Sequence, residues 1–94
     1  MPALDAKTVT QRLLQLNGWT REGDAIARTF SFKNYYETMA FVNATAWISH
    51  REDHHPDLIV GYNKCKMIYS THSEGGTTEK DFECAGKIEK LMGL

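Results

Sequence analysis

Near the N-terminus, apolar residues recur at helical spacing and then give way to an alternating pattern. The helical repeat consists of Val9, Leu13 and Leu16. Asp5 precedes it as a residue type that caps helices, and Gly18 follows it as a stop signal. Alternation over 19–22 and 25–33, on either side of a Gly-Asp pair, is typical of a β-hairpin. This part of the chain therefore predicts a helix followed by two antiparallel strands.

A second helical pattern covers the middle of the chain. Asn34, with Glu37 three residues later, is a capping-box variant that has Asn in place of Ser or Thr. The 3.6-residue repeat that follows consists of Tyr35, Met39, Asn43, Ala46, Trp47 and His50. Pro56 disfavours helical geometry at His55, so the helix must end before it. We expect a helix over about 35–51, with its aromatic side chains mainly in the core.

The last part of the chain alternates and then becomes helical again. Segments 58–60 and 65–72 are predicted strands, and SEGGTT (73–78) is a predicted loop. Thr78 can cap a last helix, with Asp81 at its third position. The apolar stripe of that helix consists of Phe82, Ala85, Ile88, Leu91 and Met92. The element order is therefore α-β-β-α-β-β-α.

This order predicts the fold class. A chain of 94 residues is expected to form one domain, here spanning residues 1–94, with a small core. Strands joined in hairpins favour a four-stranded antiparallel sheet, and the helices are expected to pack on one face of it. The prediction is a single α+β domain.

Charge and composition argue against several classes of protein. Eleven basic residues are balanced by twelve acidic ones, whereas a non-specific nucleic-acid binder needs a basic face. The longest apolar run, Met39–Val42, is far shorter than the ~20 residues that span a bilayer. The N-terminal MPALDAKTV lacks a secretory signal pattern. Cys65 and Cys84 form no CxxC pair and are predicted to be reduced thiols, so we expect a cytoplasmic protein.

The histidines are the most informative residues. All four lie between positions 50 and 72. His50 and His54 are four residues apart, as on one helix face, while His55 precedes a proline and His72 ends a predicted strand. Any one of them alone is best explained as a surface imidazole. Together they are candidates for acid–base chemistry around one pocket.

Other hypotheses compete with acid–base chemistry. His50, His54 and His72 would supply the three protein ligands of a catalytic zinc site, but their spacing matches no common zinc motif. SEGGTT contains glycines but lacks the GxxxxGK[ST] pattern of a phosphate-binding loop. A protein-interaction module is a further hypothesis, because the helix around Met39–Trp47 offers more apolar surface than one small core is expected to cover.

Several segments together resemble a known family. These are GW at 18–19, GDAIARTFSFKNYYETMAFV at 23–42, HREDHHPD at 50–57, LIVGYNKCKMIYSTH at 58–72 and TEKD at 78–81. In content and order they resemble the pterin-4a-carbinolamine dehydratases. The similarity covers nearly the whole chain, and HHP followed by STH at this spacing is much more specific than a histidine pair alone.

The resemblance implies an activity. Members of the family dehydrate 4a-hydroxytetrahydrobiopterin to quinonoid dihydrobiopterin and water, in the recycling of tetrahydrobiopterin after aromatic amino-acid hydroxylation. No metal or organic cofactor is implied. The catalytic histidines of the family fall on His54, His55 and His72 of this chain.

The resemblance also implies substrate contacts. The pterin-contacting segments fall on Asp53–Pro56 and on Ser70–Ser73, which includes Thr71. His50 stands where many members have Glu, but histidine is an accepted variant there, so His50 is kept as a substrate contact. Lys80 stands where some members have Arg, and a lysine lacks the bidentate contact that Arg makes. Trp19 is the aromatic residue most expected to reach the pocket, because it follows a glycine that ends a helix.

The expected chemistry suits imidazole. Dehydration of a carbinolamine requires protonation of the leaving hydroxyl and loss of a ring proton, and a group with a pKa of about 6.5 can serve either step near neutrality. The hypothesis is that His54 and His72 flank the reacting carbon and that His55 assists. The residues do not show which histidine is the acid and which the base.

The resemblance suggests partners as well. Family members form dimers through sheet edges and tetramers through helices, so a homo-oligomer, dimer or homotetramer, is expected. In metazoa the family also supplies a dimerisation cofactor of a homeodomain transcription factor. A transcription factor is thus a second partner suggested by the resemblance, together with a nuclear location and without direct contact to nucleic acid.

Overall fold

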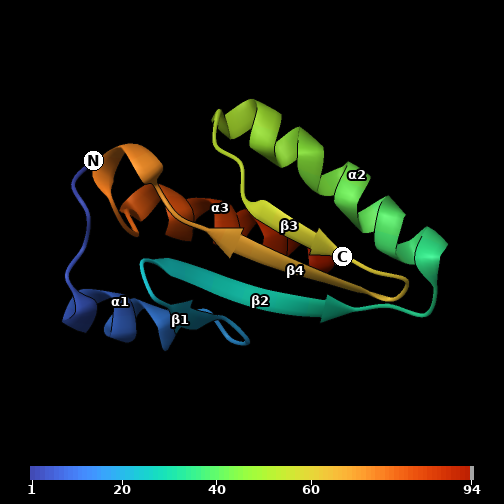
Figure 1. The fold of residues 1–94 in the computed structure, drawn as a ribbon, viewed down its shortest axis with the longest axis horizontal. Helices are drawn as coiled ribbons and strands as arrows, with labels where there is room; N and C mark the ends of the chain where they lie inside the picture. The colour runs from blue at the N-terminus through green and yellow to red at the C-terminus, as the bar shows by residue number, and fades with distance from the viewer. Residues whose placement is uncertain (94) are drawn as a thin grey trace.

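The computed structural model describes residues 1–93, and the predicted element order is confirmed (Figure 1). The helices are α1 (Ala6–Leu13), α2 (Tyr35–Glu52) and α3 (Glu79–Met92), and a short 3-10 helix, η1, covers His72–Glu74. The strands are β1 (Thr20–Glu22), β2 (Ala25–Ser31), β3 (Asp57–Val60) and β4 (Lys64–Tyr69). Residues 1–93 thus form an α-β-β-α-β-β-α domain.

The four strands form one antiparallel sheet in the order β1-β2-β4-β3. The two central strands pair along most of their length, with Ile26 opposite Tyr69 and Phe30 opposite Cys65. β1 and β3 are the two edges. Because β3 is joined to β4 by a tight turn, the end of β4 lies next to the start of β3, where the HHP sequence enters the sheet (Figure 1).

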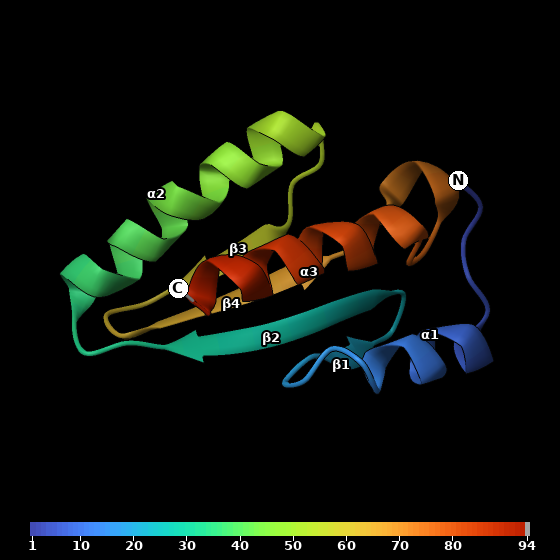
Figure 2. The ribbon, with the colours of Figure 1, turned by 180° about the vertical axis from the view of Figure 1, so that it is seen from behind.

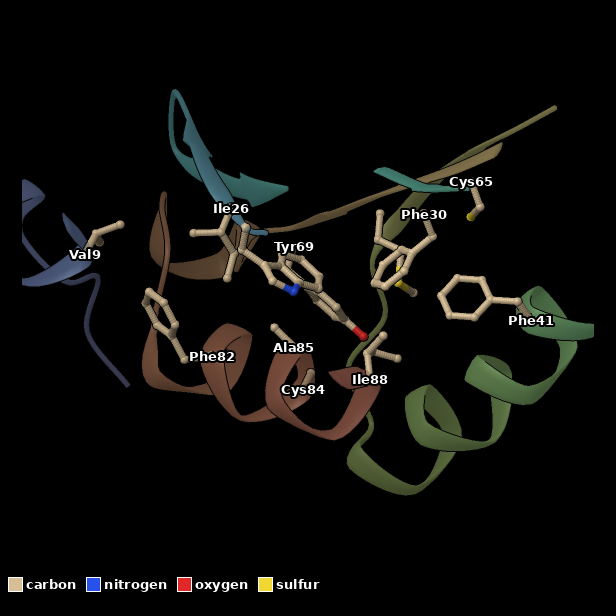
Figure 3. Packing of buried hydrophobic residues seen from close by; sticks show 12 residues of the cluster. Val9, Ile26, Phe30, Phe41, Cys65, Tyr69, Phe82, Cys84, Ala85 and Ile88 are labelled. Carbon is tan, nitrogen blue, oxygen red and sulfur yellow. The ribbon is translucent and has the colours of Figure 1, made fainter. Parts of the chain in front are cut away.

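The helices α2 and α3 lie on one face of the sheet, as predicted (Figures 2 and 3). Successive residues of a strand point to opposite faces, so alternate residues of β4 point toward the helices. The core lies in this layer and is built from Val9, Trp19, Ile26, Phe30, Phe41, Cys65, Met67, Tyr69, Phe82, Cys84, Ala85 and Ile88. Figure 3 shows Tyr69 in its middle, between β2 and α3.

The orientation of α2 differs from the prediction. The residues of α2 that are buried are Thr38, Phe41 and Thr45. Phe41 packs on Phe30, with ring centroids 4.7 Å apart. Trp47 is 74% exposed and Tyr35 is 48% exposed, so their expected place in the core is wrong. The physical reason is that α2 has apolar residues on two faces, and periodicity alone does not show which one meets the sheet.

Three elements, α1, β2 and β4, end earlier than predicted. α1 ends at Leu13, after which Gln15 and Leu16 donate backbone hydrogen bonds three residues back, so the last turn is 3-10 rather than α. β2 ends at Ser31 rather than at residue 33. β4 ends at Tyr69 rather than at 72, because Thr71 pairs with Gly76 and folds the segment between them into η1.

Replacement of a core residue on α3 tests this packing. Ile88 is fully buried, so Ile88→Ala removes core contacts and should lower the free energy of unfolding by about 2–5 kcal/mol. Met92 lies on the same helix but is 42% exposed, so Met92→Ala should change the free energy of unfolding by less than about 0.5 kcal/mol. Urea denaturation measures both, and equal effects would contradict the burial of this face.

Candidate functional site

The site begins where α2 ends, at a backbone motif that reverses the chain. Asp53 adopts the left-handed conformation (φ 50°, ψ 43°), which non-glycine residues seldom adopt. Its N–H donates to the carbonyl of His50, and the N–H of His54 donates to the carbonyl of Ser49. These two bonds form a Schellman motif, with Asp where glycine is usual. The helix therefore ends through its own backbone, and Pro56 keeps the following segment extended.

The reversal brings His54 against a buried carboxylate on α3. Nε2 of His54 lies 2.6 Å from Oδ1 of Asp81. The His54 side chain is 15% exposed, whereas that of Asp81 is completely buried. The other Asp81 oxygen, Oδ2, accepts from the backbone N–H of Thr78 at 2.8 Å and from the hydroxyl of Thr71 at 2.9 Å. Asp81 thus joins the ends of α2 and β4 to the start of α3.

One face of the His54 ring is covered by an aromatic side chain. The rings of His54 and Tyr69 stack with centroids 5.8 Å apart and planes 12° apart. Tyr69 is fully buried, and Trp19 packs against it at 6.0 Å. Burial raises the pKa of the Tyr69 hydroxyl well above its usual range, so it stays neutral at physiological pH. Tyr69 therefore acts here as an apolar surface against the imidazole.

The other predicted catalytic histidines lie at the surface. His72 is the first residue of η1, directly after Thr71, and is exposed. His55 follows His54 and is also exposed. Thr71 links His72 to the His54–Asp81 pair through a single peptide unit and one hydrogen bond. The structure thus connects His54 with the His72 segment, and His55 adjoins them by sequence.

The predicted substrate contacts divide into three groups. Asp53, Pro56, Ser70, Thr71 and Ser73 belong to the two segments that carry the histidines. His50 is exposed on α2, beside Trp47 at 6.0 Å between ring centroids. Trp19 is only 4% exposed and lies in the core, where its indole N–H donates to Glu89 at 2.9 Å. Trp19 therefore lies near His54 only indirectly, through Tyr69.

Lys80 takes part in an ion-pair network between α2 and α3. Its ammonium lies 3.0 Å from Oε1 of Glu52, and the ammonium of Lys87 lies 3.0 Å from Oε2. The hydrogen bonds from Lys87 and Lys80 hold the pKa of the Glu52 carboxyl below its usual value. The same Glu52 carboxylate raises the pKa of Lys80. Lys80 is thus fixed at the border of the site by an acidic partner that sequence spacing does not reveal.

Residues 1–93 also contain a sizeable cavity between α2 and α3 and two free thiols. The cavity, of about 530 Å³, borders the Glu52 ion pairs but does not include His54 in its lining, which consists of Ala44, Trp47, Ile48, Arg51 and Glu52 on α2 and Lys87, Lys90 and Leu91 on α3. In the described chain, no three His, Cys, Asp or Glu side chains are grouped so that they could hold a metal ion. Both thiols are free and buried, and burial raises the pKa of Cys84 to about 11, which makes it a poor nucleophile near neutrality.

Two residues of this site are not identified by the sequence pattern. Both lie in segments that resemble the family, but the pattern gives Asp81 only the role of a helix cap and Tyr69 only that of an alternating strand residue. The capping motif gives part of the signal for Asp81, because it places the carboxylate at the start of α3. The contact with His54, 27 residues earlier in the chain, depends on the tertiary fold.

Comparison with known proteins identifies the family. The family model described as pterin 4 alpha carbinolamine dehydratase matches residues 2–91. The chain belongs to this family. A relative from Nitrosospira multiformis that bears the family's name is 62% identical over 94 residues, which is all of this chain and 83% of the relative. One from Nitrosomonas eutropha is 55% identical, over 98% of this chain and 82% of its own.

Solved structures agree with this assignment. A transcriptional coactivator/pterin dehydratase from Brucella melitensis superposes with a TM-score of 0.88 at 32% identity, covering 94% of this chain and 96% of its own. A pterin dehydratase-like protein described as a RuBisCO assembly factor superposes with a TM-score of 0.69 at 24% identity and shares the fold. No helix within residues 1–93 of the dehydratase-family chain is long and apolar enough to cross a membrane.

The ion-pair network predicts a pH-dependent contribution to stability. Because the folded-state pKa of Glu52 is lowered, its stabilising effect is full above the usual value of 4.5 and is lost as the pH falls through the lowered pKa. Glu52→Gln should therefore lower the free energy of unfolding at pH 7, and the difference from the native protein should shrink as acid protonates Glu52. Urea denaturation across this pH range measures it.

Glu83→Gln is the matched control for Glu52→Gln. Glu83 lies 3.8 Å from Lys80 and its side chain is 47% exposed, so its effect should be small at every pH. A Glu52 effect that does not diminish in acid would contradict the role assigned to its charge.

Proposed function

We propose that this chain dehydrates a 4a-hydroxytetrahydropterin, 4a-hydroxytetrahydrobiopterin being the reference substrate, to the quinonoid dihydropterin. The observation that carries the proposal is the pairing of His54 with the buried Asp81, beside the segment of His72, in a chain that belongs to the dehydratase family. Recycling of tetrahydrobiopterin after aromatic amino-acid hydroxylation, in the cytoplasm, is part of the same proposal.

The reaction requires two proton transfers and no external oxidant. The bond between C4a and the hydroxyl oxygen breaks, the oxygen takes up a proton and leaves as water, and the N5 lone pair replaces the lost bond. A ring N–H proton is then lost, which gives the neutral quinonoid product. In this proposal His54 and His72 carry the two transfers and His55 assists, since an imidazole can donate or accept near neutrality.

The substrate is proposed to lie over the segments that carry the histidines. Asp53–Pro56, which includes His54, and Ser70–Ser73, which includes His72, offer backbone and side-chain groups for this contact. Lys80 is fixed close by through Glu52, and His50 lies two residues before the end of α2. Trp19 acts from the core, where it supports the Tyr69 ring.

Self-association is part of the proposal and is supported by the edge strand β3. Leu58, Ile59 and Val60 are 37%, 61% and 41% exposed, although they alternate toward both faces of the sheet. An exposed apolar edge has unpaired backbone groups that another strand can satisfy. A dimer formed through β3, or a tetramer that also uses α2, would cover this surface.

A second function, binding of another protein, is favoured by the outer face of α2. Tyr36 is 80% exposed and Trp47 is 74% exposed, and large aromatic side chains are typical of binding surfaces. The Brucella melitensis protein is described as both a coactivator and a dehydratase. We propose that α2 of this chain binds either a second copy or a partner such as a transcription factor, through a surface that lies beside His50 but does not include His54, His55 or His72.

Loss of the histidines tests the proposed activity. Freshly prepared 4a-hydroxytetrahydropterin loses water slowly unaided, so the catalysed rate is the difference in absorbance decay with and without protein. His54→Ala or His72→Ala should reduce that rate by about 10²–10⁴-fold, the usual contribution of a positioned acid or base. Asn43→Ala, exposed on α2, is the control and should retain full activity. Equal decay with the intact protein and the double histidine variant would refute the site.

A charge on the edge strand tests self-association. In a two-fold antiparallel pair whose β3 strands overlap along their whole length, the copies of Ile59 lie near the symmetry axis. Ile59→Lys then brings two like charges together and should shift the light-scattering mass toward the 10.7 kDa monomer. Thr29→Lys places the same charge on β2, away from the edge, and should leave the mass unchanged. An oligomer unaffected by Ile59→Lys would exclude β3 as the contact.

A further inference from the structure

The Asp81 carboxylate is fully buried and both of its oxygens are engaged. Oδ1 contacts Nε2 of His54 at 2.6 Å, while Oδ2 accepts from Thr71 at 2.9 Å and from the backbone of Thr78 at 2.8 Å. A helix cap does not require such burial: Asp5 caps α1 while exposed to solvent. Burial of a charge is costly unless it is matched by strong hydrogen bonds, and three donors provide them here.

The chemistry of these groups fixes the direction of each hydrogen bond. A carboxylate only accepts, so the proton between Asp81 and His54 belongs to Nε2 of the imidazole. For the same reason the Thr71 hydroxyl donates to Asp81, and the Thr78 hydroxyl, 2.8 Å from it, must donate to Thr71. Neutral His54 then has its lone pair at Nδ1, which makes no hydrogen bond within residues 1–93.

Tyr69 also restricts the His54 imidazole, by stacking on one face of it. Its ring lies parallel to the imidazole, within 12°, so His54 cannot rotate about its ring bond without losing this contact. The Tyr69 hydroxyl is buried and lacks a hydrogen-bond partner among residues 1–93, and Figure 3 shows it directed toward Ile88. The part of Tyr69 that serves His54 is therefore its ring.

We propose that Asp81 and Tyr69 are positioning residues that hold His54 in one tautomer, with Nε2 protonated and Nδ1 free, and that Asp81 also ties His54 to the segment of His72. The catalytic consequence rests on the proposed function. His54 is then the base: Nδ1 takes the ring proton of the pterin, and Asp81 stabilises the imidazolium that forms. His72, which bonds to no carboxylate within residues 1–93, supplies the proton that leaves with the hydroxyl as water. Solvent restores both histidines.

The tautomer is measurable without any substrate. Long-range ¹H–¹⁵N spectra of the intact protein above the titration range of histidine should show a protonated Nε2 and an unprotonated Nδ1 for His54, whereas a free imidazole averages both forms. His72 should show such averaging. An averaged signal for His54, or a protonated Nδ1, would overturn the inference whether or not the protein has dehydratase activity.

Substitutions distinguish an effect of Asp81 on the position of His54 from a general loss of stability. Asp81→Asn should disturb the tautomer signal and lower kcat by about 10²–10⁴-fold with less change in KM, as for the orienting acid of a catalytic triad. It should have no further effect on rate in a His54→Ala background. Asn34→Ala removes the cap of α2 instead, so it should lower stability while leaving the tautomer unchanged. Additive rate losses in Asp81→Asn/His54→Ala would contradict positioning through His54.

The role of the Tyr69 ring has its own pair of variants. Tyr69→Leu should lower kcat and broaden the His54 signals, and Tyr69→Phe should restore both, because it regains the ring without the hydroxyl. Failure of the phenylalanine variant to restore them would assign the effect to the hydroxyl and overturn the proposed role of the ring. A fixed tautomer in a protein that does not accelerate pterin dehydration would support the positioning and refute the proposed function instead.

Discussion

The buried carboxylate of Asp81 is the constraint on which the site depends. A charge without access to water must be surrounded by donors, and here the donors come from the end of α2, the end of β4 and the start of α3. His54 lies 27 residues before Asp81, whereas Thr71 and Thr78 lie within ten residues of it and also bond to each other. The requirement to satisfy one side chain therefore fixes the position of His54 relative to the segment of His72.

The hydrophobic core also helps to hold His54 in place. The register of β2 with β4 sets Tyr69 opposite Ile26, and Trp19 packs on its ring. Because Tyr69 is held by the sheet, its ring offers His54 a rigid surface rather than a mobile side chain. The residues that orient the imidazole thus belong to the most buried part of the protein, while His55 and His72 remain exposed to solvent.

The sequence predicts the elements well where the signal is local. Asp5, Asn34 and Thr78 all cap their helices as predicted, since each bond depends on residues only two or three positions away. Glu37, however, accepts from the N–H of Lys33 and so does not complete the capping box predicted at Asn34. Predictions that depend on tertiary contacts are less successful. Trp47 is exposed because α2 turns its Phe41 face to the sheet, and the contact of Asp81 with His54 is visible only once β4 and α3 are in place. The dehydratase family is confirmed, and the roles of the histidines stay predictions.

The position of β3 has a consequence for how the protein responds to its own concentration. The strand begins at Asp57, two residues after His55, and is one of the two edges of the sheet. A second copy that pairs with this edge would lie next to the segment proposed to contact the pterin. Occupancy of one location would then alter the affinity of the other, and by thermodynamic linkage the effect would be equal in both directions. Subunit assembly and ligand affinity would be two measurements of a single coupling free energy.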